Sequence, residues 1–376
     1  MKRVEYAGSV HDEEEIEAVV SVLRGGPTAL RIGKFVREME RLVAESFGKR
    51  RGVMVNSGSS ALYLAVELLG LAPGDEIITS AVTFSTDIAP MVRAGLVPVF
   101  VDVEPDTYQI DVAQIESAIG PRTKAILAPN LIGNCPDWDV IREIADRHGL
   151  QVVEDSCDCL GATLRGTPTG TRSDISLTSF ALSHIITAAG TGGMLCVDDD
   201  ERLDKALLLR RWGRRSEPKL FGSKKGDKRF FSEIDGIEYD DLFIFDEVGW
   251  NFEPSEISAA FGVVQLRKLP LNLAATRIDF MPFSGHKLYA PKGVGALYVR
   301  RGTRLAPFMR GAGHESGDQL DEEWVGVGGP GFPRVALVPD SCDVGRCRRV
   351  FPTVPVVGRR SSGIAHGAPP RVWGCV

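Results

Sequence analysis

The sequence lacks any apolar run that approaches the roughly 18 residues needed for a membrane-spanning helix. Its first residues are polar and acidic, so we expect no membrane anchor and a cytoplasmic protein. It also lacks an excess of positive charge, because its formal net charge is −6. A nucleic-acid-binding domain needs a basic surface. We therefore exclude a membrane protein and expect no nucleic-acid partner.

The sequence lacks a metal-binding pattern of cysteines. Seven cysteines are spread over 376 residues, and the close pairs are Cys157 with Cys159 and Cys342 with Cys347. Neither pair is repeated at the spacing of a zinc site, so we expect reduced thiols and no metal. The remaining composition, 43% hydrophobic and 25% charged, is typical of a globular chain of about two domains.

The sequence does contain a regular alternation of short apolar segments and amphipathic segments. Two helices are predicted first, over 11–24 and 33–47, because apolar residues recur at helical spacing. Strands are then expected at 52–55, 76–79, 97–103, 124–128, 150–154 and 175–180, with helices at 61–69, 90–94, 112–119 and 138–148. This alternation predicts an α/β fold, in which helices cover both faces of a mostly parallel sheet.

The turns after these strands carry the candidate binding residues, since ligands bind beyond the carboxyl ends of such strands. Ser59 and Ser60 stand where a strand turns into a helix, so they could hold a phosphate or simply cap the helix. Phe84 could stack on a ring or belong to the core. Asp155 follows a mainly apolar strand, and a carboxylate buried there needs a cation or a strong donor.

The stretch 173–193 combines an alternating strand, a histidine and several glycines. The strand would deliver His184 to the edge of a site, and Gly190, Gly192 and Gly193 permit a close approach of the backbone. Taken alone, this stretch is better explained by a core strand followed by a hydrogen-bonded histidine. Motifs elsewhere in the chain are needed to distinguish a histidine at a binding site from a histidine with a structural role.

A series of motifs in fixed order resembles the DegT/DnrJ/EryC1/StrS family of sugar aminotransferases and dehydratases, which use pyridoxal 5′-phosphate (PLP). The resemblance runs from about Tyr6 to Leu271. It implies the aspartate aminotransferase-like fold (PLP fold type I), a three-layer sandwich with a mostly parallel sheet, and a homodimer. Its motifs are YAGSVHDEEEIEAV, VNSGSSALYLAVELLGLAPGDEIITSAVTFSTD, VFVDVEPDTYQID, VVEDSCDCLGA, the SF of 179–180 and GWNFEPSEISAAFGVVQL.

The resemblance implies a role for four polar residues at the cofactor phosphate. Ser59, Ser60 and Ser179 would hold the phosphate of the same chain. Asn251 would reach the phosphate that the neighbouring subunit binds, because this family builds its site across a homodimer. An isolated monomer would then be an incomplete catalyst.

At the cofactor ring, the resemblance implies that Phe84 stacks and that Asp155 pairs with the ring nitrogen, which stays protonated so that the ring accepts electrons. The position five residues after Ser179 usually carries the lysine that bonds to the cofactor aldehyde. Here it is His184, which cannot form that bond. His184 resembles the branch of nucleotide-sugar 3-dehydratases, and so does Asp158, which we count among the cofactor-binding residues.

In that branch the cofactor works as pyridoxamine 5′-phosphate (PMP), the histidine removes a proton from its methylene, and the sugar loses its 3-hydroxyl. Imidazole suits a proton transfer near neutral pH. A subset adds an iron–sulfur cluster, but no cysteine lies between Cys196 and Cys342, so we expect none. We expect a 3-dehydratase acting on a nucleotide-linked 4-keto-6-deoxyhexose for lipopolysaccharide or deoxysugar biosynthesis. The alternatives are a sugar aminotransferase of this family or a truncated, non-catalytic remnant.

Beyond residue 275 the sequence changes, and the C-terminal domain of the family is expected to be atypical or incomplete. We predict a cofactor-binding domain over 1–275, a fragment over 276–317 and a disordered tail over 318–376. The run SGHKLYAPKGVGALYVR resembles the lysine segment of the cysteine desulfurase and selenocysteine lyase family, in which Lys287 would bind the cofactor. This segment could supply its lysine to the site, but we interpret it as a recombination remnant. The lysine-free, arginine-rich tail indicates unselected sequence rather than an interaction surface.

Overall fold

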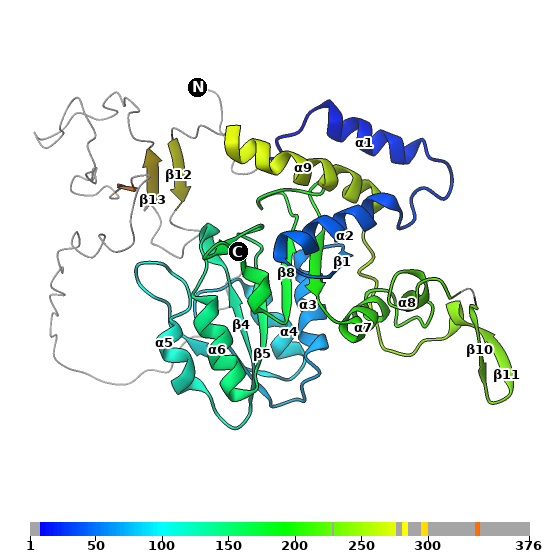
Figure 1. Cartoon of the computed structure of the whole chain (residues 1–376), viewed down its shortest axis with the longest axis horizontal. Helices are drawn as coiled ribbons and strands as arrows, with labels where there is room; N and C mark the ends of the chain where they lie inside the picture. The colour runs from blue at the N-terminus through cyan, green and yellow to red at the C-terminus, as the bar shows by residue number, and fades with distance from the viewer. Residues whose placement is uncertain (1–7, 228, 276–279, 285–294, 300–334, 339–376) are drawn as a thin grey trace, which may run out of the picture. The chain divides into compact units, whose positions relative to one another are not determined.

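The computed structural model describes residues 8–227 and 229–275, together with three strands at 280–284, 295–299 and 335–338. The chain divides into two units, Met1–Ala275 and Thr276–Val376, and each is described by itself. The first unit contains a large mixed sheet between helices (Figure 1). No helix in the described part is both long enough and apolar enough to cross a membrane.

Within the described residues of the first unit, seven strands form one sheet in the order β1-β9-β8-β5-β4-β2-β3. Neighbouring strands run parallel except at β9, which is antiparallel to both β1 and β8. The predicted mostly parallel sheet is thus confirmed. The strands are β1 (Arg51–Val55), β2 (Glu76–Ser80), β3 (Val97–Val101), β4 (Thr123–Pro129), β5 (Gln151–Asp155), β8 (Ile175–Ser179) and β9 (Gly193–Val197).

Helices cover both faces of this sheet (Figure 1). Along β1, Val53 and Val55 face one layer of helices and Met54 faces the other, as the two-residue period of a strand requires. One layer contains α3 (Gly58–Leu68), α4 (Ser85–Arg93) and α7 (Asp200–Arg210). The other contains α2 (Lys34–Phe47), α5 (Val112–Ile115), α6 (Trp138–His148) and α9 (Glu256–Ala275), and α1 (Glu13–Leu23) packs on α9.

Most predicted elements exist, and their ends differ for identifiable reasons. Helix α3 begins at Gly58 rather than at Ala61, because the Ser57 side chain caps it by accepting the N–H of Ser60. The helix predicted at 90–94 is longer, and the one predicted at 112–119 ends in a 3₁₀ turn, Glu116–Ala118. Helices and strands of the first unit without a prediction are β6 (Thr163–Leu164), β7 (Thr167–Pro168), β9, α7, α8 (Glu217–Leu220), β10 (Phe231–Ile234), β11 (Ile237–Asp240) and α9.

A carboxylate from a distant part of the chain caps helix α2. Gly33 occupies the N-cap position and has no side chain that could accept a hydrogen bond. Glu256, the first residue of α9, instead accepts the backbone N–H groups of Gly33, Phe35 and Val36 at 2.9, 2.8 and 3.1 Å. Because Glu256 is buried, this contact holds the start of α9 against the start of α2. Both helices pack against the loop that follows β8.

In the second unit, the described residues form a sheet of three strands. Strand β12 (Phe280–Ser284) is antiparallel to β13 (Gly295–Val299), which is parallel to β14 (Val335–Val338). Lys287 and the arginine-rich tail lie outside the described residues. The predicted division into a fragment and a tail therefore stays a prediction.

Candidate active site

The carboxyl end of β8 packs directly on the start of helix α3. A Cβ atom added at Gly58 would lie 2.5 Å from the Cβ of Ser179. One added at Gly193 would lie 2.4 Å from the backbone carbonyl of Ser57. These approaches need residues without a Cβ, so the two glycines bring Ser179 against the first turn of α3.

The first turn of α3 presents backbone N–H groups next to serine hydroxyls. The Oγ of Ser57 accepts the N–H of Ser60 at 3.1 Å and lies 2.9 Å from the Ser60 hydroxyl. The first backbone bond of the helix runs from Ala61 N–H to the Ser57 carbonyl at 3.2 Å. The N–H groups of Gly58 and Ser59 precede that bond, and such N–H groups at a helix start attract anions.

Asn56, the residue before this turn, connects three parts of the site. Its carbonyl accepts the Thr191 hydroxyl at 2.7 Å, which anchors the glycine-rich loop after β8. Its side-chain oxygen accepts the Ser60 hydroxyl at 2.6 Å, and its N–H donates to the Phe252 carbonyl at 3.1 Å. Asn251 is therefore near the start of α3, and its exposed side chain accepts the N–H of Glu253.

Two carboxyl groups meet at the end of β5. Asp155, the last residue of that strand, is buried, and its Oδ1 accepts the backbone N–H of Cys157 at 2.9 Å. The fully buried Asp87 of α4 lies against it. Burial raises the pKa of Asp155, and burial together with the Asp155 charge raises the pKa of Asp87 well above its usual range.

His184 lies beside Asp158, a further carboxyl group near this pair. Its side chain is 20% exposed, and its Nδ1 is 3.4 Å from the Oδ1 of Asp158. That Nδ1 is buried and has no hydrogen-bond partner among the described residues. The Asp158 charge also raises the pKa of Asp155, so Asp158 is near both groups. His184 and Asp155 thus belong to one site, and Phe84, at the start of α4, is 65% exposed beside it.

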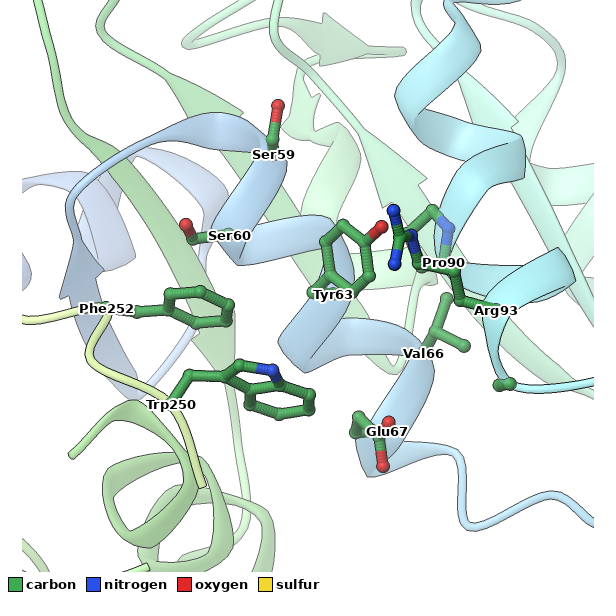
Figure 2. A pocket seen from close by; sticks show the side chains of 10 residues that line it. Ser59, Ser60, Tyr63, Val66, Glu67, Pro90, Arg93, Trp250 and Phe252 are labelled. Carbon is green, nitrogen blue, oxygen red and sulfur yellow. The ribbon is translucent and has the colours of Figure 1, made fainter. Parts of the chain in front are cut away.

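A pocket of about 480 Å³ borders the serine end of this site. Figure 2 shows Tyr63 of α3 and Arg93 of α4 on one side and Trp250 and Phe252 on the other. The Trp250 and Phe252 rings are stacked, with centroids 5.2 Å apart and planes 6° from parallel. Asp155 and His184 do not line the pocket.

The structure groups the predicted site residues into two clusters. One contains Ser59, Ser60 and Ser179, and the other contains Asp155, Asp158 and His184, with Phe84 exposed nearby and Asn251 in a flanking segment. Their roles stay predictions. Sequence reasoning missed Ser57, Asn56 and Asp87. Asp87 gave no functional signal, because it precedes the helix predicted at 90–94, and an acidic residue near a helix start is usually explained by the helix dipole.

Comparison with known families confirms both resemblances found in the sequence. Residues 9–288 match the DegT/DnrJ/EryC1/StrS aminotransferase family, and residues 260–325 match the class-V aminotransferases. The first match covers most of the chain. The second overlaps its end and includes the segment around Lys287, whose structure lies outside the described residues.

Two curated relatives show what this chain is similar to. A GDP-perosamine synthase from Caulobacter vibrioides is 36% identical over 244 residues, which are 65% of this chain and 59% of that protein. A dTDP-4-dehydro-2,6-dideoxy-D-glucose 3-dehydratase from Saccharopolyspora spinosa is 40% identical over 277 residues, 70% of this chain and 58% of that protein. The chain therefore spans less than two thirds of the length of these relatives.

A solved structure supports the predicted fold. The E. coli GDP-4-keto-6-deoxy-D-mannose 3-dehydratase with bound hydrated PLP matches with a TM-score of 0.65 and 33% identity. The match covers 74% of this chain and 71% of that chain. The predicted PLP fold type I is confirmed, and PLP in that structure is the cofactor that the sequence motifs imply.

Proposed function

Because the chain belongs to the DegT/DnrJ/EryC1/StrS aminotransferase family, we propose that it removes the 3-hydroxyl of a nucleotide-linked 4-keto-6-deoxyhexose with PMP. The observation that carries the proposal is His184, an imidazole beside Asp158 at the position where most family members have lysine. The relatives include both 3-dehydratases and sugar aminotransferases. A side chain that cannot bond to the cofactor aldehyde favours the dehydratase.

The start of helix α3 fits the phosphate of PLP or PMP. Gly58 and Gly193 carry no Cβ that would fill the space between the strand end and the helix, and the Ser179 hydroxyl lies at their contact. Ser59 and Ser60 would bind the phosphate with the N–H groups of the first turn. The positive end of the helix dipole would add to this attraction.

The acidic end of the site fits the cofactor ring. The buried Asp155 carboxylate would accept a hydrogen bond from the protonated ring nitrogen, and that positive charge would compensate a group whose burial raises its pKa. The exposed Phe84 ring would stack on the pyridine ring of the cofactor. When bound, the cofactor supplies a ring that takes up electrons during the reaction.

His184 would hold and move the proton. Its Nδ1 faces Asp158, so Nε2 is the nitrogen that remains to accept a proton from the reacting group. The Asp158 carboxylate would stabilise the imidazolium and hold the ring in place, as a carboxylate does for histidine in hydrolase triads. Asp158 thus serves the cofactor indirectly, through His184.

We also propose that the active species is a homodimer in which Asn251 completes the partner's phosphate site. Large apolar side chains are exposed on the hairpin of β10 and β11 and on the segment after it, and exposed apolar surface of this kind marks interaction sites. They are Phe231, Ile234, Ile237, Tyr239, Phe243, Phe245 and Val248. Light scattering of the full chain at micromolar concentration should give the mass of two chains, and a monomer would contradict the dimer.

Replacing His184 with lysine tests the site. After incubation with PLP, treatment with borohydride, denaturation and removal of unbound cofactor, the His184→Lys variant should keep the cofactor covalently attached, because the new amine bonds to the aldehyde, whereas the matched His184→Asn variant should not. A folded His184→Lys protein that does not attach the cofactor would show that residue 184 does not face it. The unmodified enzyme is then incubated with PMP and a nucleotide-linked 4-keto-6-deoxyhexose. A nucleotide sugar that is lighter by one oxygen atom, because hydrogen has replaced its 3-hydroxyl while the amine of PMP is consumed and released as ammonia, supports the dehydratase. Exchange of the ketone for an amine indicates an aminotransferase. Failure to retain any cofactor indicates a non-catalytic protein.

A further inference from the structure

The site contains a second buried carboxyl group to which the proposed function gives no role. Asp87 lies in the first turn of α4 with its side chain fully buried. Its Oδ2 accepts the hydroxyl proton of Thr83, while its Oδ1 is buried without a hydrogen-bond donor among the described residues. The neighbour of Asp87 is Asp155, whose carboxyl is within side-chain hydrogen-bonding contact. An unpartnered buried oxygen therefore belongs to a pair of carboxyl groups in contact.

This pair cannot carry two negative charges. In the described part of the chain, no lysine or arginine forms an ion pair with either carboxyl group, and Asp158 adds a further negative charge nearby. The other groups that face the pair are the Thr83 hydroxyl and the N–H and thiol of Cys157, and His184 lies beside Asp158. Two carboxylates in contact inside a protein repel each other, so the pair must hold one proton.

The surroundings of the two groups indicate which of them holds that proton. Asp155 has a donor at its Oδ1 in the N–H of Cys157, which favours the ionised carboxylate. Asp87 is the more deeply buried, and burial and the Asp155 charge raise its pKa well above the usual range. For Asp155, burial raises the pKa, and contact with Cys157 and with Asp87 opposes that rise. The proton therefore belongs on Asp87.

We propose that Asp87 is a protonated positioning residue, which accepts the Thr83 hydroxyl at one oxygen and donates from the other to the Asp155 carboxylate. This bond gives the unpartnered Oδ1 a partner. It fixes the carboxylate that would face the ring nitrogen, and it keeps that carboxylate ionised. The part that concerns the ring rests on the proposed function, whereas the shared proton exists in the protein without cofactor.

Two substitutions of similar size separate the proposed role from simple packing. In Asp87→Asn, the amide oxygen can still accept from Thr83 and the amide N–H can still donate to Asp155. In Asp87→Leu, neither contact is possible. Asp87→Asn should therefore behave as the original protein does, and Asp87→Leu should not.

The first measurement needs no cofactor. The infrared difference spectrum between the unmodified full chain and Asp87→Asn at neutral pH should contain the carbonyl stretch of one protonated carboxyl group, which the variant lacks. A difference spectrum that shows only an ionised carboxylate would overturn the shared proton. This result stands even if the protein turns out not to bind PMP.

The second measurement uses PMP labelled with ¹⁵N in the ring. The ring-nitrogen chemical shift should show a protonated nitrogen in the unmodified protein and in Asp87→Asn. PMP affinity should fall by about 10- to 100-fold in Asp87→Leu, the range expected for losing one hydrogen bond to a charged group. An unprotonated ring nitrogen in the unmodified protein, or equal affinities of the two variants, would overturn the positioning role. If no form of the protein binds PMP, the proposed function fails and the infrared band still decides the shared proton.

Discussion

Replacing Gly58 with alanine tests whether the contact between β8 and α3 builds the phosphate end of the site. The new methyl group would lie 2.5 Å from the Cβ of Ser179 and 2.9 Å from its Oγ. Carbon atoms in contact prefer about 3.5–4.0 Å, so the strand end and the helix start must separate by about 1 Å. A rotation of Ser179 cannot relieve this overlap, because its Cβ is fixed by the backbone of β8.

The expected cost follows from that displacement. Overpacking of this kind destabilises a protein by about 1–3 kcal/mol. Alanine is a better helix former than glycine, by up to about 1 kcal/mol within a helix, which offsets part of the loss. We expect Gly58→Ala to lower the free energy of unfolding by about 1–2 kcal/mol. The effect on PLP binding should be about 10- to 100-fold, because separating β8 from α3 by this much breaks a hydrogen bond to the charged phosphate, and such a bond contributes about 1.5–3 kcal/mol.

The assay combines urea unfolding with a fluorescence titration of PLP. Gly120→Ala is the matched control, since its added Cβ would meet the Glu76 carboxylate at 3.4 Å, an ordinary contact. The control should change stability by less than about 0.5 kcal/mol and leave PLP affinity unaltered. If Gly58→Ala binds PLP as tightly as the control and unfolds at the same urea concentration, the contact between Ser179 and α3 does not build the phosphate site.

Two further predictions concern helix α9. Glu256→Ala should lower the free energy of unfolding, measured in urea, by about 3 kcal/mol, because three backbone N–H groups lose a buried carboxylate. Glu256→Gln should cost less than half as much. Equal costs of the two variants would show that the charge of Glu256 has no part in the cap. Lys268 donates to Asp12 at 2.7 Å and to Glu15 at 2.8 Å, which lowers the pKa of Asp12 and, against burial, that of Glu15. Lowered folded-state pKa values add stability above the unfolded values near 4, and this stability is lost as the pH falls through the folded values. The free energy of unfolding of the unmodified protein should therefore exceed that of Lys268→Met at pH 7, and this difference should disappear below about pH 4. A difference in unfolding free energy that does not change with pH would refute this linkage.

Sequence patterns were sufficient for most helices and strands up to β8, whereas β6, β7 and the elements after β8 had no prediction. Apolar spacing is a local property, so helix α6 could be predicted from residues that are neighbours in the chain. Strand β9 could not be assigned in this way. It returns antiparallel to β8 without a helix between them, because the loop from 180 to 192 reverses the chain and is held on Asn56. Whether a short apolar run pairs forward or backward depends on its connection.

What the sequence alone determined about this protein is its family, its layered α/β architecture and the histidine at the place of the usual lysine. What only the tertiary structure decided is which side chains touch. Asp87 follows β2 and Asp155 ends β5, and these strands lie on either side of β4 in the sheet. Their carboxyl groups meet because the strand order and the start of α4 bring them together, and no periodicity in the chain encodes that distance.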